Sequence, residues 1–390
     1  MICFAGYTFS SIAGDVDFST GAAPMPIVVA IERPSGQLLI WENSTIIEFN
    51  PWEMGSYDSS NPAFAPLRYI GSTFINGQLP SNGTCVAGFD NAGFVVGTSS
   101  SLFNQAFLQI QNHPDVPDFL LRTINNTLAR IGEKNSDVSL WPNPFYQYKV
   151  GSNRNANFST LTLVDGGEDL QNLPLNPLTS SLRQVDVILA VDSSADTPTA
   201  WPNGTSLVAT YQRSANGFST SNHEFPRVPD QNSFVNLGLN RRPTFFGCET
   251  NHTTDAGPLV VYLPNTPYSY FSNVSTFDLE YTTEERNKII QNGYDVVTMG
   301  NASVDPQWPA CLGCAILSRS FGRTKTAPPP VCVGCFERYC WNGTVNSTAP
   351  PVFEPAQIIV PESAGERLSE TPSLGCFMIG WLMVLVFFGL

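Results

Sequence analysis

A short stretch near the middle of the chain has residues suited to proton transfer. It reads Asp165-Gly166-Gly167-Glu168-Asp169 and follows the β-prone run 159–164. Two consecutive glycines permit φ > 0 and a sharp turn without side chains. The ends of strands are where α/β enzymes place chemistry, so Asp165 is a candidate general base. An ordinary strand-to-loop turn would give the same Asp-Gly pair without any chemistry.

Histidine is scarce in this chain, which argues against a Ser-His-Asp triad. His113 precedes a proline, His223 lies in a polar stretch, and His252 lies inside an Asn-His-Thr sequon, so each is expected at the surface. The sequence also lacks a P-loop, a dinucleotide-binding glycine motif, H-E-x-x-H and an EF-hand pattern. No metal and no organic cofactor is implied.

The longer string from Asp165 to Leu178, D-G-G-E-D-x-x-N-x-P-x-x-P-L, resembles the catalytic-aspartate segment of fungal lysophospholipases (phospholipase B). These enzymes share a catalytic core with the animal cytosolic phospholipases and, more distantly, the patatins. With the late cysteine cluster, further stretches extend the resemblance over roughly residues 5–345: NPWEMGSY (50–57), GFDNAGF (88–94), GTSSSLFN (97–104), VILAVDSSAD (187–196) and WPNGTSL (201–207).

This resemblance implies an α/β fold that is part of a patatin/cytosolic-phospholipase-like catalytic domain with a central mixed sheet. It implies hydrolysis of the fatty-acyl esters of lysophospholipids or phospholipids by a Ser–Asp dyad in which Asp165 is the base. Gly166, Gly167, Asp192 and Ser193 are then expected at the same pocket. A strand-end turn with helix-capping chemistry is the alternative for Asp192 and Ser193.

The nucleophile that the resemblance implies has no counterpart in the sequence. The family's serine lies in a G-x-S-G-G turn, and no G-x-S-x-G occurs in the 390 residues. That serine and the family's anion-stabilising arginine lie upstream of the segment where this chain starts. We therefore expect an N-terminally truncated catalytic domain over residues 1–348. The alternative is a catalytically inactive cell-surface glycoprotein that retains the fold.

The composition excludes one large class of function and indicates the compartment. The net charge is −14, only 13% of residues are charged, and Arg241-Arg242 is the only adjacent basic pair, so nucleic-acid binding is not expected. Glycosylation is expected instead, because ten N-x-[ST] sequons occur, at Asn43, Asn82, Asn125, Asn157, Asn203, Asn251, Asn273, Asn301, Asn342 and Asn346.

The C-terminal end has the layout of a glycosylphosphatidylinositol (GPI) attachment signal. A Pro/Ser/Glu linker (349–365) ends in small residues from Ser363, the expected attachment site. A polar spacer and an apolar tail (366–390) follow. A membrane-spanning helix is the alternative, although the seventeen apolar residues from Leu374 are at its short limit. Residues 1–21 lack signal-peptide features. We expect a secreted or cell-surface protein, held by lipid at the plasma membrane or cell wall.

Nine cysteines are present, and one of them, Cys376, lies in the apolar tail. The two C-x-x-C pairs between 311 and 335 fit either a four-thiolate zinc site or disulfides. An oxidising secretory route and a fifth nearby thiol favour disulfides. Disulfides are therefore predicted, with open connectivity, for Cys85, Cys248, Cys311, Cys314, Cys332, Cys335 and Cys340; Cys3 or Cys85 is allowed a partner in the missing upstream region.

The periodicity of apolar residues predicts the elements that must position Asp165. The strand at 185–191 is nearly continuously apolar, which is typical of a parallel sheet. Aromatic residues in 262–277 are interpreted as core or as a lipid-contacting surface. Strands are predicted at 26–31, 37–41, 44–49, 158–164, 185–191 and 260–263. Helices are predicted at 99–110 with Ser99 or Ser100 as cap, at 115–131 and 206–211, and at 282–299 with Thr283 as cap.

Overall fold

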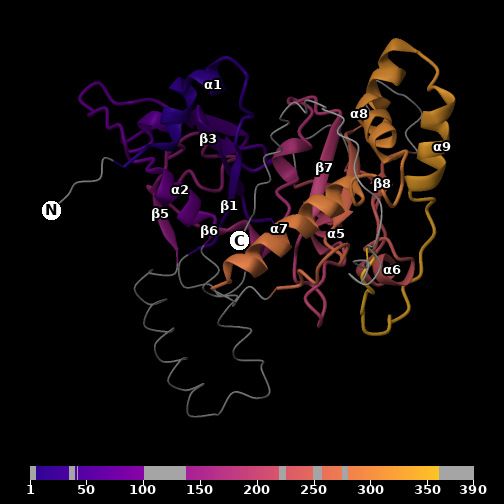
Figure 1. Cartoon of the computed structure of the whole chain (residues 1–390). Helices are drawn as coiled ribbons and strands as arrows, with labels where there is room; N and C mark the ends of the chain where they lie inside the picture. The colour runs from indigo at the N-terminus through magenta and orange to yellow at the C-terminus, as the bar shows by residue number, and fades with distance from the viewer. Residues whose placement is uncertain are drawn as a thin grey trace, which may run out of the picture.

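The computed structural model describes residues 6–34, 40–41, 43–100, 138–218, 225–248, 257–274 and 280–359. It contains a six-stranded sheet in the N-terminal half and a three-stranded sheet in the C-terminal half, each with helices packed on it (Figure 1). The α/β class predicted from the sequence is confirmed. Parallel strand pairing, however, is confined to the smaller sheet within these residues.

The six-stranded sheet carries Asp165 and is antiparallel throughout, in the order β4-β3-β2-β1-β6-β5. The predicted strands at 26–31, 44–49 and 158–164 correspond to β1, β2 and β6. The strands of the six-stranded sheet are β1 (Val28–Glu32), β2 (Ile46–Phe49), β3 (Glu53–Ser56), β4 (Ala63–Pro66), β5 (Ser139–Pro142) and β6 (Thr160–Asp165).

One face of this sheet is covered by aromatic packing around Trp141. Its indole stacks on Phe94 at 4.7 Å between ring centroids and donates a hydrogen bond to the Thr98 hydroxyl at 3.0 Å. Both partners belong to α2 (Ala92–Thr98), a helix that the sequence analysis missed. The remaining short elements of this half are η1 (Phe9–Gly14), α1 (Val16–Ser19) and η2 (Leu67–Tyr69).

The three-stranded sheet has the order β7-β9-β8, with β7 (Val187–Asp192) parallel to β9 (Leu259–Pro264) and β8 (Thr244–Phe246) antiparallel to β9. All six residues of β9 are buried. Strand β7 was predicted to be buried, but Leu189 is 44% and Val191 is 40% exposed. The exposed residues alternate with the buried Ile188, Ala190 and Asp192, so one face of β7 is partly uncovered.

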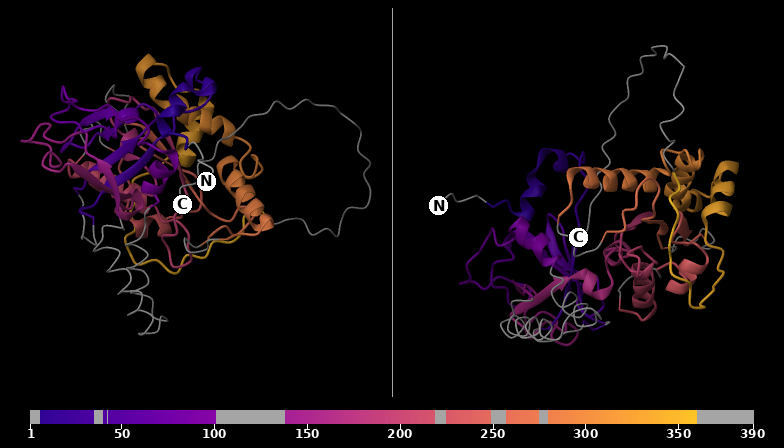
Figure 2. Two further views of the ribbon diagram at one scale, coloured as in Figure 1. Left: turned by 90° about the vertical axis from the view of Figure 1, so that its left-hand side faces the viewer. Right: turned by 60° about the horizontal axis from the view of Figure 1, so that its bottom comes forward.

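Helices lie on both faces of the smaller sheet (Figure 2). α5 (Thr205–Ala215) and α6 (Gln231–Asn236) lie on one face, and α7 (Thr283–Thr298), α8 (Trp308–Thr324) and α9 (Pro330–Tyr339) lie on the other. The predicted helix at 282–299 is confirmed as α7, although its cap is Thr282 rather than Thr283. The Thr282 hydroxyl accepts from the Glu285 N–H at 3.1 Å.

Some predicted elements lie outside the described residues, namely most of the strand at 37–41 and nearly all of the two helices at 99–110 and 115–131. Ser99, expected to start a helix, is the C-cap of α2. The aromatic stretch is largely core where it is described: Tyr262 and Tyr268 are buried, whereas Phe271 is half exposed. None of the helices in the described ranges is long and apolar enough to span a bilayer.

The segment expected as a linker from residue 349 contacts the body of the protein as far as the structure describes it. Phe353 is buried, and its carbonyl accepts from the Thr199 hydroxyl at 2.6 Å. Further along, the Ile358 N–H donates to the carbonyl of Pro267 at 2.9 Å. Residues 349–359 therefore pack against the body of the protein.

The two halves are joined by buried ion pairs. Arg183, which precedes β7, pairs with Glu48 of β2 and stacks on the Tyr57 ring. Arg213 of α5 pairs with Asp58, which follows β3, at 2.8 Å. Both acids are almost completely buried, and removing one partner from such a pair is strongly destabilising.

Candidate active site

Asp165 is the last residue of β6 and lies opposite Ala30 of the neighbouring strand β1. The chain then turns into the 3₁₀ helix η3 (Gly166–Asp169), and Asp165 is its N-cap. Its Oδ1 accepts a hydrogen bond from the Gly167 N–H at 2.7 Å. Asp165 is buried, with only 7% of its surface exposed. The strand end thus holds one carboxylate in a fixed direction.

Burial raises the pKa of Asp165 to about 6, and the Gly167 N–H opposes that rise by stabilising the carboxylate. At neutral pH the group is therefore ionised, yet it holds a proton far better than an exposed aspartate. A general base works best when its pKa lies close to the working pH. Both the position and the proton affinity of Asp165 suit that role.

The two glycines of the turn are buried. The sequence suggested positive φ for them, but neither lies in the left-handed region. The residue with positive φ is Leu170, at 58°, which ends η3 and donates its N–H to the carbonyl of Gly167 at 3.1 Å. A Cβ at Gly166 would lie 3.6 Å from the Val29 side chain, in ordinary contact. Neither positive φ nor lack of space therefore requires glycine at Gly166, and the Gly167 donor is a main-chain N–H.

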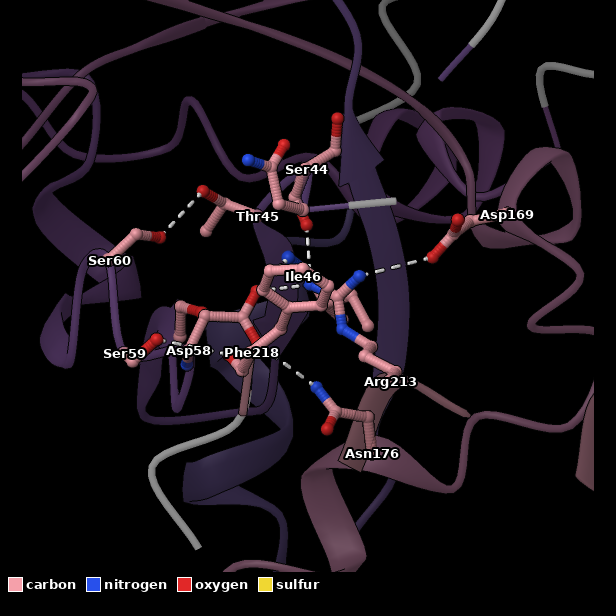
Figure 3. Close-up of polar contacts among 12 residues, drawn as sticks. Ser44, Thr45, Ile46, Asp58, Ser59, Ser60, Asp169, Asn176, Arg213 and Phe218 are labelled. Carbon is pink, nitrogen blue, oxygen red and sulfur yellow. Dashed lines mark hydrogen bonds and ion pairs between the residues drawn. The ribbon is translucent and has the colours of Figure 1, made fainter. Parts of the chain in front are cut away.

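Two arginines pair with the acids of this turn. Arg33, next to the end of β1, lies 3.6 Å from Glu168, and Arg213 of α5 lies 3.4 Å from Asp169. Figure 3 shows the Arg213 guanidinium between Asp169 and Asp58. Sequence reasoning noticed both acids but neither partner, because a pattern of acids does not indicate which distant arginine will reach them.

The residues after the turn bring the ends of β6 and β7 together. The Asn172 amide donates to the Ser194 hydroxyl at 3.1 Å, and the Leu173 N–H donates to the Ser206 hydroxyl of α5 at 3.4 Å. The next short element is η4 (Asn176–Leu178). These hydrogen bonds join the segment after the active-site turn to the loop that follows β7 and to α5.

Asp192, predicted at the pocket rim with a strand-end turn as the alternative, has contacts that fit the alternative. It is completely buried at the end of β7, where it accepts from the Tyr262 hydroxyl at 2.8 Å and from the Ser194 N–H at 3.0 Å. Burial raises its pKa. A carboxylate without exposed surface and with these partners is placed to cap a turn, and its role at a pocket stays a prediction. Ser193, the other candidate here, is exposed.

Asp196 lies near this buried carboxylate, and its raised pKa predicts how the stability of the protein depends on pH. Burial, with the Asp192 charge second, raises the pKa of Asp196 to about 7. Because this folded pKa exceeds the unfolded value of about 3.9, the native state favours the protonated form. The protonated Asp196 side chain makes its full contribution to stability below about pH 4, and this contribution is lost as the pH rises through the folded pKa of about 7.

We therefore expect Asp196→Asn to gain on the wild type as the pH rises. Asn stays neutral, so its free energy of unfolding relative to wild type should increase by about 4 kcal/mol between pH 4 and pH 8. Denaturant unfolding at both pH values measures this difference. Parallel stability curves for the two proteins would show that Asp196 titrates normally.

The serines nearest to a nucleophile motif are engaged elsewhere. Ser99 donates its hydroxyl proton to the carbonyl of Val29 at 2.6 Å, and Ser100 donates to the carbonyl of Val96 at 3.0 Å. The Ser99 bond joins the C-terminal end of α2 to β1, and the Ser100 bond lies within the C-terminal end of α2. The third serine of that run, Ser101, and all three histidines lie outside the described residues.

Disulfides are present at six of the seven predicted cysteines. The pairs are Cys248–Cys340, Cys311–Cys335 and Cys314–Cys332. The last two join α8 and α9, so the thiols considered for zinc are bonded to one another. Cys85 was also predicted to be disulfide-bonded, but it is an exposed free thiol in an irregular loop and has no bonded partner within the described residues.

Five of the predicted glycosylation sites are exposed, namely Asn82, Asn157, Asn301, Asn342 and Asn346. Asn43, Asn203 and Asn273 are partly buried. Asn125, Asn251 and the predicted GPI attachment site Ser363 lie outside the described residues. The exposed sites are accessible to a glycosyltransferase, while glycosylation itself stays a prediction.

Comparison with known proteins identifies the family. The lysophospholipase catalytic domain family matches residues 3–346. Lysophospholipase 2 of Aspergillus fumigatus is 59% identical over 352 residues, covering 90% of this chain and 59% of the relative. Lysophospholipase 3 of the same species is 54% identical over 381 residues, covering 97% of this chain and 60% of the relative. The chain thus spans about three fifths of the length of these relatives.

A solved structure supports the fold. Human GIVD cytosolic phospholipase A2 superposes with a TM-score of 0.54 at 15% identity, over 82% of this chain and 47% of that one. At such low identity the match concerns the fold alone, and it agrees with the predicted relation to cytosolic phospholipases. The family match across residues 3–346 establishes that the chain belongs to the lysophospholipase catalytic domain family.

Proposed function

We propose that this chain carries the general base of a lysophospholipase that hydrolyses fatty-acyl esters of lysophospholipids. The observation that carries the proposal is Asp165, a buried carboxylate at the end of β6 with a pKa of about 6. The family match and the names of the relatives support the reaction class.

In the proposed reaction Asp165 transfers one proton in each of the two half-reactions. It accepts the hydroxyl proton of a serine as the serine oxygen attacks the acyl carbonyl, and it passes that proton to the departing glycerol oxygen. Water then attacks the acyl-enzyme. Asp165 takes a proton from the water and returns it to the serine oxygen as the fatty acid leaves. The net reaction consumes one ester and one water, and no histidine is needed.

The proposed serine comes from outside the 390 residues. Two observations support this: no G-x-S-x-G occurs in the sequence, and Ser99 and Ser100 donate to main-chain carbonyls. The resemblance that identified Asp165 places the nucleophile in such a turn. An aspartate alone supplies only the base, so we propose that the 390 residues by themselves lack turnover.

A direct comparison of two proteins tests this proposal. The 390-residue chain and the full-length natural protein that contains it are assayed for fatty-acid release from lysophosphatidylcholine. We expect release by the full-length protein only. Turnover by the 390 residues would place the nucleophile within them. If neither protein releases fatty acid, the alternative is favoured, which is an inactive surface glycoprotein that retains the fold.

We further propose that the protein is anchored at the outer cell surface by lipid. The small residues from Ser363, the polar spacer and the apolar tail support this, as do the exposed sequons and the three disulfides. Phosphatidylinositol-specific phospholipase C is expected to release the protein from intact membranes into the supernatant. Ser363→Leu, which removes the small attachment residue, serves as control. Full retention of the wild type, with the tail peptide detected by mass spectrometry, would indicate a peptide anchor.

A further inference from the structure

The direction of the Asp165 carboxylate depends on the turn that follows it. The hydrogen bond that holds this carboxylate comes from Gly167, within the single turn of η3. Asp165 also ends its strand, so the sheet fixes its backbone on one side only. Any rotation of the turn would move the Gly167 N–H and redirect the carboxylate.

Asp169, at the far end of the same turn, faces a cation that is already fixed. Arg213 is 3% exposed and lies 3.4 Å from Asp169 and 2.8 Å from Asp58 (Figure 3). The guanidinium also donates to the carbonyl of Ser44. A planar guanidinium with several acceptors around it is held in orientation as well as in position.

Asp58 is itself held from other elements, which makes the Arg213 anchor independent of the turn. Its Oδ2 accepts from the Ile46 N–H of β2 at 2.6 Å, and its Oδ1 accepts from the Asn176 amide of η4 at 3.3 Å. Both the sheet and the segment after the active-site turn therefore converge on one buried carboxylate. Because Arg213 is held by Asp58, its guanidinium fixes the position of Asp169.

A second tie reaches the turn from the sheet side. Arg33 lies 3.6 Å from Glu168 and is completely buried, and its own N–H donates to the carbonyl of Thr162 in β6 at 3.0 Å. Successive residues of the turn are thus bound to arginines from two places, the end of β1 and α5. Ties from two directions oppose rotation better than one.

We propose that Asp169 and Arg213 are positioning residues for the base, acting through the turn that carries the Gly167 N–H. This inference rests on the proposed function of Asp165. It assigns a task to two residues that contact neither the ester nor the nucleophile in the proposed reaction.

Asp169→Asn in the full-length protein is the main test. The change removes the charge and keeps the size, and Arg213 stays paired with Asp58, so no buried cation is left alone. We expect kcat to fall by about 10- to 100-fold, in line with the cost of a small misplacement, while KM stays near wild type. Asp169→Glu restores the charge at a side chain that is 18% exposed, and should recover most of the lost kcat.

A double-mutant cycle separates positioning from general destabilisation. If Asp169 acts through Asp165, then Asp169→Asn should not lower the residual rate further once Asp165 is already Asn. Additive losses in this cycle would overturn the proposal. Asp305→Asn is the matched control, because Asp305 is a largely buried acid that precedes α8 and pairs with Arg338 of α9; it should leave kcat unchanged.

Amide hydrogen exchange gives a readout that does not need activity. In Asp169→Asn, the peptide covering 163–172 should exchange at least about tenfold faster, with no change in that peptide for Asp305→Asn. Unchanged exchange in Asp169→Asn would refute the positioning role. An active Asp165→Asn enzyme would instead refute the proposed function, while the exchange result would still decide whether Asp169 holds the turn.

Discussion

Asp165→Asn in the full-length protein is expected to lower the rate of acyl-ester hydrolysis by roughly 10³-fold or more. Asn can still accept the Gly167 N–H through its Oδ1, so the turn at the end of β6 should persist. Its amide cannot take a proton from a serine hydroxyl or from water. The loss should therefore appear in kcat, with little change in the free energy of unfolding.

The wild-type pH profile provides an independent sign of the same group. Since burial raises the pKa of Asp165 to about 6, kcat/KM should fall as the pH drops through 6, because the protonated carboxyl is no longer a base. An exposed aspartate would stay active to about pH 4. A profile that is flat from pH 7 down to pH 5 would show that a different group is the base.

Asp192→Asn is the control for this prediction, because it also neutralises a buried aspartate at a strand end. Asp192 is bound to Tyr262 and Ser194 and has no exposed surface, so we expect a far smaller loss of rate. Equal losses in the two variants would mean that both act by disturbing the fold. Activity of Asp165→Asn within a few-fold of wild type would exclude it as the base.

Local sequence signals were sufficient for the strand that carries Asp165. The β-prone run before Asp165 forms β6, and the apolar run 185–191 forms β7 in parallel with β9. Periodicity and composition are properties of a few consecutive residues, so they can be read from one sequence. The turn was also predicted, but for the wrong residues, since Leu170 and not a glycine has positive φ.

Helices α8 and α9 were not predicted, because the C-x-x-C pairs that they contain also fit zinc sites and loops. Cys311 and Cys314, like Cys332 and Cys335, are three residues apart, a spacing that places both thiols on one helical face. The same spacing also occurs in zinc sites and in loops. Only the pairing of the two helices, with Cys311 on Cys335 and Cys314 on Cys332, distinguishes these alternatives.

The ion pairs around the active-site turn could not be predicted from the sequence. Asp169 and Arg213 are 44 residues apart, and Asp58 lies 155 residues before Arg213. Their approach depends on how the two sheets dock, which no local pattern encodes. Asp192 illustrates the same limit, since it ends a strand as Asp165 does, and its hydrogen bond from Tyr262 cannot be read from the sequence.

Removal of the Cys248–Cys340 disulfide is expected to cause the largest loss of stability of any single cross-link in the described part of the chain. It joins residues 92 apart, connecting the end of β8 to the end of α9. Because Cys311–Cys335 already bypasses 24 of these, the effective loop in the unfolded chain is roughly 70 residues. Closing such a loop corresponds to about 4 kcal/mol of unfolded-state entropy.

The Cys314–Cys332 pair should contribute less, although it lies in the same region. With Cys311–Cys335 intact, the additional loop that it closes contains only about eight residues, which corresponds to about 2.5 kcal/mol. Urea unfolding of the two double alanine variants, under non-reducing conditions, measures both values. Cys85→Ala is the control and should stay within about 0.5 kcal/mol of wild type, because this thiol is exposed and unbonded. If the Cys314–Cys332 variant were the less stable of the two, loop entropy would not be the main source of the stabilisation, and the packing of α8 on α9 would depend on that bridge directly.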